Sequence, residues 1–257
     1  MKKLLFTFAL GLISTSFTIA QDNKSQNIEA TYINEIKLDY EATMKTIPQQ
    51  LRSQVGDLLK AEIDAGIFMT YHLKSNGKNS SFKLEEKINN SQNSTGFIAQ
   101  QMAAMDKHPY YKDLSTTPST YYKEVDAGVK QYLIKEAPNF NWKTTREKAE
   151  IAGYKVNKAE GVMMDSIKVT AWYAPEITVK DGPQTLSGLP GLIIKAEYES
   201  SNAKMIFTLK ELKISDKELK VNLPTKGTLV SEKEFMEEML KLQAQFKEMM
   251  GGGVDTN

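Results

Sequence analysis

The sequence predicts a mainly β protein of the α+β class: a curved antiparallel sheet or half-barrel with helices packed on it. Three observations predict this fold. Short segments rich in β-branched and aromatic residues alternate with turn residues from Tyr110 to Val221. Asn76-Gly77 separates two alternating segments, a strong signal for a two-residue hairpin. Apolar residues recur at helical spacing at about residues 47–65 and again in the C-terminal helix expected at 229–250.

Residues 1–20 have the features of a secretory signal peptide. Lys2 and Lys3 form a charged start, Leu4 to Ile13 an apolar core, and Thr18-Ile19-Ala20 a small-residue cleavage site. The apolar run is too short to span a bilayer comfortably. We therefore expect export by a cleaved signal peptide, no transmembrane segment in the mature chain, and a periplasmic or extracellular protein.

The mature chain, residues 21–228, is expected to form one β-rich domain with a helical insertion. Ala30 to Tyr40 alternates as a first strand. The period then changes to that of a helix at about 47–65, with Pro48 near its start and Gly66 as its stop. We expect this helix to lay one apolar face on the sheet.

The hairpin at Asn76-Gly77 follows directly. Its first strand is Ile67 to Leu73, and its return strand contains Phe82 and Leu84. Residues 88–95 are rich in Asn and Ser and predict an exposed loop. Ile98 to Met105 fits either a short helix or a mobile excursion.

The region after Tyr110 predicts successive hairpins of an antiparallel sheet, because short strands are separated by turn residues. The expected strands are near 120–125, 131–134, 148–151, 154–159, 167–173, 192–198, 204–211 and 218–221.

The C-terminal helix begins at a capping box, Ser231 with Glu234 three residues later. Its apolar positions form one stripe: Phe235, Met239, Leu242, Phe246 and Met249. The stripe fits a terminal helix docked on the domain, or a helix that binds a partner, because methionine adapts to varied surfaces. Capture of a soft metal has no histidine or cysteine nearby to support it.

Composition limits the function classes. The 257 residues are 40% hydrophobic and 25% charged, ordinary values for a globular protein. The 33 basic and 32 acidic residues leave no field that would attract nucleic acid or an anionic membrane. The absence of cysteine excludes a lipoprotein anchor, disulfides and thiolate metal sites. The sequence contains no P-loop, HExxH or EF-hand pattern, so we expect neither a cofactor nor a metal.

The stretch from Thr170 to Ile193 has the most specific residue choices. Pro175 ends the ladder pairing of a strand or confines it to an edge, Glu176 to Val179 continue the strand briefly, and Asp181-Gly182-Pro183 forms a turn. The Gly188-Leu189-Pro190-Gly191 stretch then predicts a tight reversal in which backbones approach closely. One interpretation is a buried corner between strands. The other is a rigid rim that presents Trp172, Glu176 and Asp181 to a ligand.

These residues carry a resemblance. The hexapeptide Gly188-Leu189-Pro190-Gly191-Leu192-Ile193, with Ala171 to Ile177 before it, is similar to the GLPGLI family of envelope proteins of Bacteroidetes. The similarity covers roughly residues 120–215. Many members carry a cysteine where this chain has Val156, so a role for that thiol does not transfer. The resemblance implies an envelope location and no established activity.

Candidate chemistry is sparse. His72 and His108 are the two histidines, and neither lies in a catalytic motif; no GxSxG or SxxK pattern occurs. Glu176 and Asp181 flank the central turn and are the least arbitrary acid–base pair, although salt bridges or turn capping also explain them. We assign no catalytic residue.

The function predicted is an exported binding or adaptor module for an apolar ligand or an envelope protein partner. A curved sheet of this kind resembles envelope lipoprotein carriers and lipid-binding domains in architecture only. The candidate binding residues are Trp172, Tyr173, Glu176, Asp181, Phe235, Met239 and Phe246. The alternative is an envelope hydrolase with its carboxylate acid and base at the central turn. A third possibility is a structural adaptor of an outer-membrane complex.

Overall fold

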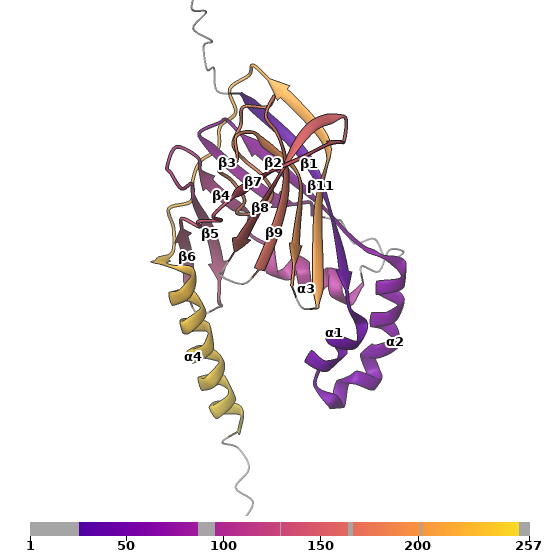
Figure 1. Cartoon of the computed structure of the whole chain (residues 1–257). Helices are drawn as coiled ribbons and strands as arrows, with labels where there is room; N and C mark the ends of the chain where they lie inside the picture. Colours follow the sequence, from indigo (N-terminus) through magenta and orange to yellow (C-terminus); the bar gives the residue numbers. More distant parts are fainter. Residues whose placement is uncertain (1–25, 87–95, 129, 164–166, 201, 252–257) are drawn as a thin grey trace, which may run out of the picture.

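One twelve-stranded sheet dominates the computed structural model, which describes residues 26–86, 96–128, 130–163, 167–200 and 202–251. The strand order is β12-β6-β5-β4-β3-β2-β1-β11-β10-β9-β8-β7. Neighbouring strands are antiparallel except for β12, which pairs in parallel with β6. The sheet curves into an open half-barrel (Figure 1), which confirms the predicted fold class. The expected signal peptide and the 88–95 loop lie outside the described residues.

The described chain forms twelve strands and four helices. The strands are β1 (Asn27–Leu38), β2 (Ile67–Ser75), β3 (Asn79–Leu84), β4 (Tyr110–Asp113), β5 (Thr120–Asp126), β6 (Gln131–Glu136), β7 (Lys143–Ile151), β8 (Tyr154–Met163), β9 (Ile167–Ala174), β10 (Leu192–Glu199), β11 (Ala203–Ser215) and β12 (Thr228–Val230). The helices are α1 (Tyr40–Thr46), α2 (Gln49–Ala65), α3 (Phe97–Met105) and α4 (Glu232–Gly251).

The core lies on the concave face, where alternation on each strand directs apolar side chains inward. Aromatic rings from five strands meet there: Tyr32, Tyr71, Phe82, Tyr198 and Phe207. The Tyr71 and Phe82 rings stack with centroids 4.9 Å apart, and Phe207 meets Tyr71 edge-on at 5.5 Å. These contacts join the β2–β3 hairpin to β11 and so help to hold the curve.

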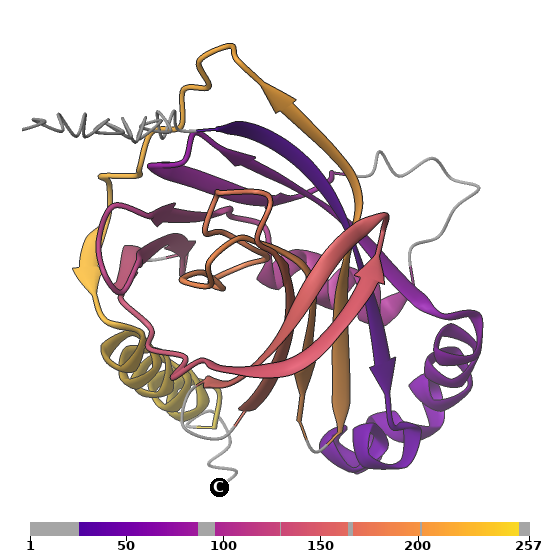
Figure 2. The same ribbon diagram turned by 45° about the horizontal axis from the view of Figure 1, so that its top comes forward.

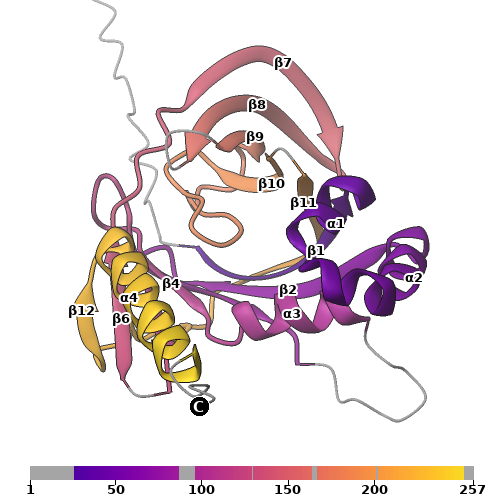
Figure 3. The ribbon, with the colours of Figure 1, turned by 90° about the horizontal axis from the view of Figure 1, so that it is seen from below.

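The segment between β9 and β10, residues 175–191, lies inside the curve of the sheet (Figures 2 and 3). Glu176 to Val179 was expected to continue the β9 strand, but this segment contains no strand among the described residues and only one isolated bridge, Asp181 to Ser187. It turns inward because its apolar side chains, Ile177, Val179, Leu186 and Leu189, are all buried in the core. The half-barrel is therefore filled in part by its own chain.

The helices lie at one end of the sheet, with α1 and α2 on one side and α4 on the other (Figure 1). The predicted helix at 47–65 is α2, but it packs mainly against α1 and α3 and not on the sheet, which corrects the expectation. Only Gly56 and Leu59 of α2 are buried, so its apolar face is too narrow to cover strands. Instead α3 packs its apolar side chains, among them Ile98 and Met102, against the core.

The segment around Glu218 to Val221, expected to be a strand, is irregular. Its backbone carbonyls are satisfied differently: the Asn76 amide donates to Leu219 O at 3.1 Å, and the Asn79 amide to Val221 O at 3.1 Å. The hairpin turn therefore holds this segment by side chains, which removes the need for a strand ladder. Within the described part of the chain, no helix is long and apolar enough to cross a membrane.

Candidate functional site

The 175–191 segment owes its path to two glycines with different roles. Gly188 has φ +86°, a left-handed conformation that side chains rarely adopt, in open space. At Gly191 a Cβ would overlap the carbonyl oxygen of Ala174. The segment can therefore return against the end of β9 only with glycine at position 191. Leu189, between these two glycines, is buried in the core.

A buried ion pair fixes this segment to the opposite side of the half-barrel. The ammonium of Lys112, on β4, lies 2.5 Å from the Asp181 carboxylate, and both side chains are almost fully buried. The same ammonium donates to Gly182 O at 2.6 Å and to Leu186 O at 3.2 Å. Burial lowers the pKa of Lys112, and the Asp181 charge opposes that shift. We call this group, with its two carbonyl acceptors, the Lys112 anchor.

One further hydrogen bond holds the segment itself, and another holds the start of β10 directly after it. The Trp142 indole N–H, just before β7, donates to Ser187 O at 2.9 Å. The Tyr32 hydroxyl, on β1, donates to Ile193 O of β10 at 2.7 Å. Contacts from β4 and from the entry to β7 therefore converge on residues 175–191, which we call the internal strut.

The candidate residues near the central turn are separated by this arrangement. Asp181 is buried in the Lys112 anchor, whereas Glu176 is exposed to solvent. Trp172 is half-buried, and Tyr173, its neighbour on β9, is buried in the core. Because Glu176 is in water and Asp181 is held by a lysine, these two carboxylates offer no shared acid–base site.

The C-terminal candidates lie on α4, which starts at the predicted capping box. Ser231 N–H donates to the Glu234 carboxylate at 2.7 Å, and Glu234 N–H donates back to Ser231 Oγ at 3.2 Å. The Phe235 ring meets Tyr132 of β6 edge-on at 5.4 Å, and Met239 is half-buried. Phe246 belongs to α4, but its side chain lies outside the described residues.

The first turns of α4 hold the helix against the sheet edge. The hydroxyl of Tyr121, on β5, donates to the Glu232 carboxylate at 2.9 Å. On the adjacent face of α4, Met236 and Leu240 are 56% and 59% exposed. The helix therefore carries more apolar surface than the sheet covers.

A second buried polar cluster surrounds Asp106, directly after α3. Its carboxylate accepts from the hydroxyls of Tyr71 at 2.7 Å and Tyr110 at 3.0 Å. The Lys123 ammonium lies 3.3 Å from the same carboxylate and donates to the Tyr110 oxygen at 2.7 Å. Burial and the Asp106 charge raise the pKa of Tyr110 well above its ordinary value, and burial lowers the pKa of Lys123.

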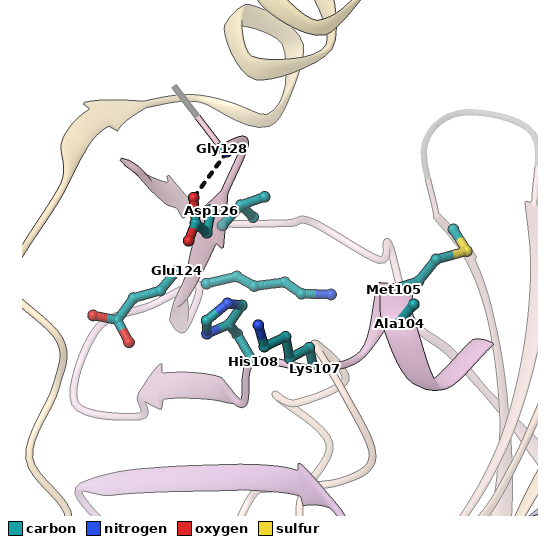
Figure 4. A pocket seen from close by; sticks show the side chains of 9 residues that line it. Ala104, Met105, Lys107, His108, Glu124, Asp126 and Gly128 are labelled. Atoms are coloured by element: carbon teal, nitrogen blue, oxygen red, sulfur yellow. Dashed lines mark hydrogen bonds between the residues drawn. The ribbon is translucent and has the colours of Figure 1, made fainter. Parts of the chain in front are cut away.

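The two histidines lie in different settings. His72 is on the outer face of the sheet, with Nδ1 3.3 Å from Thr31 Oγ1 and Nε2 3.9 Å from the Glu85 carboxylate. This is an exposed cross-strand group, and none of its members lines the described pocket. That pocket, of about 320 Å³, lies between the end of α3 and β5 and is lined in part by His108 (Figure 4).

The sequence did not single out Lys112, Asp106 or Lys123. Their partners are distant in the chain: Lys112 and Gly182 are 70 positions apart. One signal was available in the sequence. Alternation along β4 places Lys112 on the same face as Tyr110, so that a charged residue occupies an inward position.

Comparison with solved structures finds matches at low sequence identity. A structure titled "Structure of PNGF-II in C2 space group" matches 84% of this chain with a TM-score of 0.50 at 14% identity, and the match covers 33% of that chain. This chain thus spans about a third of that protein's length. An uncharacterized conserved protein from Thermus thermophilus matches 81% of this chain and 91% of its own, with a TM-score of 0.37 at 6% identity.

A putative outer membrane lipoprotein-sorting protein domain from Vibrio parahaemolyticus matches 86% of this chain and 93% of its own, with a TM-score of 0.32 at 9% identity. No curated protein sequence matches the chain. At the sequence level, a family model described as "Protein of unknown function (Porph_ging)" matches residues 127–195. That match contains Asp181, Gly188 and Gly191, the residues that shape and anchor the internal strut.

Proposed function

We propose that this chain is an exported envelope protein of the GLPGLI type that binds a partner protein through α4. A carrier of an apolar ligand would keep its concave face open, whereas here the 175–191 segment occupies that face. The single observation that carries the proposal is the apolar surface of α4, where Met236 and Leu240 stay exposed on the face adjacent to the one that contacts the sheet.

The expected partner is a protein with an apolar groove that can accept this helix. A helix with anchors at i and i+4, such as Met236 and Leu240, is suited to lie in such a groove. Methionine adds adaptability, because its unbranched side chain repacks against irregular surfaces.

Site-specific photo-crosslinking tests this proposal. A photoreactive residue is placed at position 240 in the full chain, with position 155, exposed on β8, as the matched control. We expect one adduct of defined mass from position 240 and none from 155, and we expect Met236→Glu to abolish the adduct.

Two outcomes would contradict the proposal. Equal adducts from positions 240 and 155 would indicate random encounters. Purified protein that carries a stoichiometric lipid, detected by native mass spectrometry, and gives no adduct at position 240 would favour a ligand carrier instead.

A further inference from the structure

The pocket between α3 and β5 combines open space with basic side chains from two parts of the chain. Lys107 and His108 follow the end of α3, and Lys123 comes from β5. In Figure 4 the Lys107 ammonium and the His108 ring lie next to each other within the pocket. Three nitrogen-bearing side chains thus line one open volume of about 320 Å³.

Two acidic residues, Glu124 and Asp126, also line the pocket. Glu124 turns its carboxylate away from His108 (Figure 4). The Asp126 carboxylate accepts the backbone N–H of Gly128 at 2.9 Å within the β5–β6 turn.

The carboxylates that balance Lys123 belong to other hydrogen-bonded groups. Asp106 accepts from two tyrosine hydroxyls, and Glu232 accepts from Tyr121. Asp106 and Tyr110 engage the Lys123 ammonium, which has three N–H groups. Lys123 is therefore held in one orientation at the pocket wall.

We propose that this pocket binds a compact carboxylate, held by Lys107, His108 and the Lys123 ammonium. A carboxylate presents two acceptor oxygens and a negative charge, which match donors that are basic and converge. The site is separate from α4, so this inference goes beyond the partner-binding function and stands or falls independently of it.

Amide NMR of the purified protein tests the site, with acetate as the probe and acetamide as its neutral isostere. We expect acetate, and not acetamide, to cause saturable shifts confined to residues 104–108 and 123–128. Lys107→Met and His108→Gln should each weaken acetate binding about threefold or more. Lys155→Met removes the same charge from an exposed position on β8 and should leave binding unchanged.

Three results would overturn the proposal. The first is the absence of saturable shifts up to about 100 mM acetate, a concentration well above that expected for a charge-assisted site. The second is an equal response to acetamide, and the third is equal weakening by Lys107→Met and Lys155→Met. Because Lys107 is exposed, its substitution leaves the fold intact, and the comparison remains interpretable.

Discussion

Burying the Lys112 ammonium and the Asp181 carboxylate removes two charges from water, at a cost of several kcal/mol for each ion. Their close contact and the two carbonyl acceptors of the ammonium offset that cost. The second carboxylate oxygen of Asp181 has no hydrogen-bond partner among the described residues. The carboxylate therefore depends on Lys112, and the pair is sensitive to the loss of either member.

Replacing Lys112 with methionine should lower the free energy of unfolding by about 3 to 5 kcal/mol, because Asp181 would remain buried without its cation. The measurement is urea unfolding followed by tryptophan fluorescence. Lys74→Met is the control, since Lys74 pairs with Glu29 at 3.1 Å while both are well exposed, and should cost less than about 1 kcal/mol. Equal effects of the two substitutions would show that the Lys112 anchor contributes no more than a surface pair.

Residue-level sequence reasoning identified Asp181 and offered a salt bridge or turn capping as its role, but did not identify its partner. The Asp-Gly-Pro turn was predictable, because these residue types favour turns at short range. Its lysine partner was not, because the pairing depends on which strand faces the turn across the curve of the sheet. Alternation in the sequence predicts which residues of one strand share a face, but it does not predict which distant strands come into contact.

At the scale of single elements, turns and helix caps that depend on neighbouring residues were predicted correctly, whereas contacts between elements far apart in the chain were not. The Asn76-Gly77 hairpin and the Ser231 capping box formed as expected, since each depends on neighbours within a few positions. The helix α1 was missed, although Asp39 caps it by accepting the Ala42 N–H at 2.7 Å. Its seven residues are too short for a periodic apolar signal.

The helix α3 begins with a cap supplied from another helix. Both oxygens of the Glu62 carboxylate, on α2, accept backbone N–H groups at 2.9 Å, from Ile98 and Ala99. Gly96 at the start of α3 lets Glu62 approach, because a Cβ there would overlap its carboxyl group. This contact couples α2 to α3, and through α3 to the core.

Glu62→Gln should weaken the start of α3 by about 1 kcal/mol, because the amide keeps one acceptor and loses the charge that favours a helix N-terminus. Hydrogen exchange of the Ile98 and Ala99 amides measures the effect and should become faster. Asp64→Asn, on the same helix and exposed beside Lys60, should leave those amides unchanged. Equal protection in the wild type and in Glu62→Gln would contradict the capping role.

Across the whole molecule, the sheet concentrates tyrosine hydroxyls in a dry interior. Five tyrosines have a raised pKa: Tyr32, Tyr71, Tyr110, Tyr121 and Tyr198. Burial is the main cause in each case, and a nearby carboxylate, Asp106, Asp181 or Glu232, raises the pKa further. In the unfolded chain these groups titrate near the ordinary value of about 10. The folded protein therefore holds more protons than the unfolded chain at alkaline pH.

Stability should fall as pH rises above about 10, by up to about 1.4 kcal/mol per pH unit for each buried tyrosine. The lowered pKa values of Lys112 and Lys123 make stability rise with pH, but only below pH 10.5, the ordinary pKa of lysine. Tyrosinate absorbance near 295 nm, followed with circular dichroism, measures the effect. We expect these five tyrosines to ionise together with loss of the sheet; their ionisation in a folded protein would contradict the prediction.

The curved sheet was predictable as a class, because many short alternating segments demand antiparallel pairing. Its filled interior was not, because the inward path of 175–191 depends on the Lys112 anchor and on the close approach at Gly191. The sequence left two interpretations of the central turn, a buried corner and a rigid rim, and the buried apolar side chains and Asp181 of this segment favour the buried corner.

The position of β1 between β2 and β11 has a consequence for biogenesis. Residue 27 pairs with residue 215, so β1, the first strand to be synthesised, can complete its pairing only after β11, the second-last strand, has been made. Until then one edge of β1 lacks its ladder and the two halves of the sheet, β12 to β1 and β11 to β7, cannot join, which makes folding slow and dominated by non-local pairing. Nascent or truncated chains that stop before residue 203 lack β11 altogether and expose an unpaired strand, the kind of intermediate that chaperones bind and proteases remove.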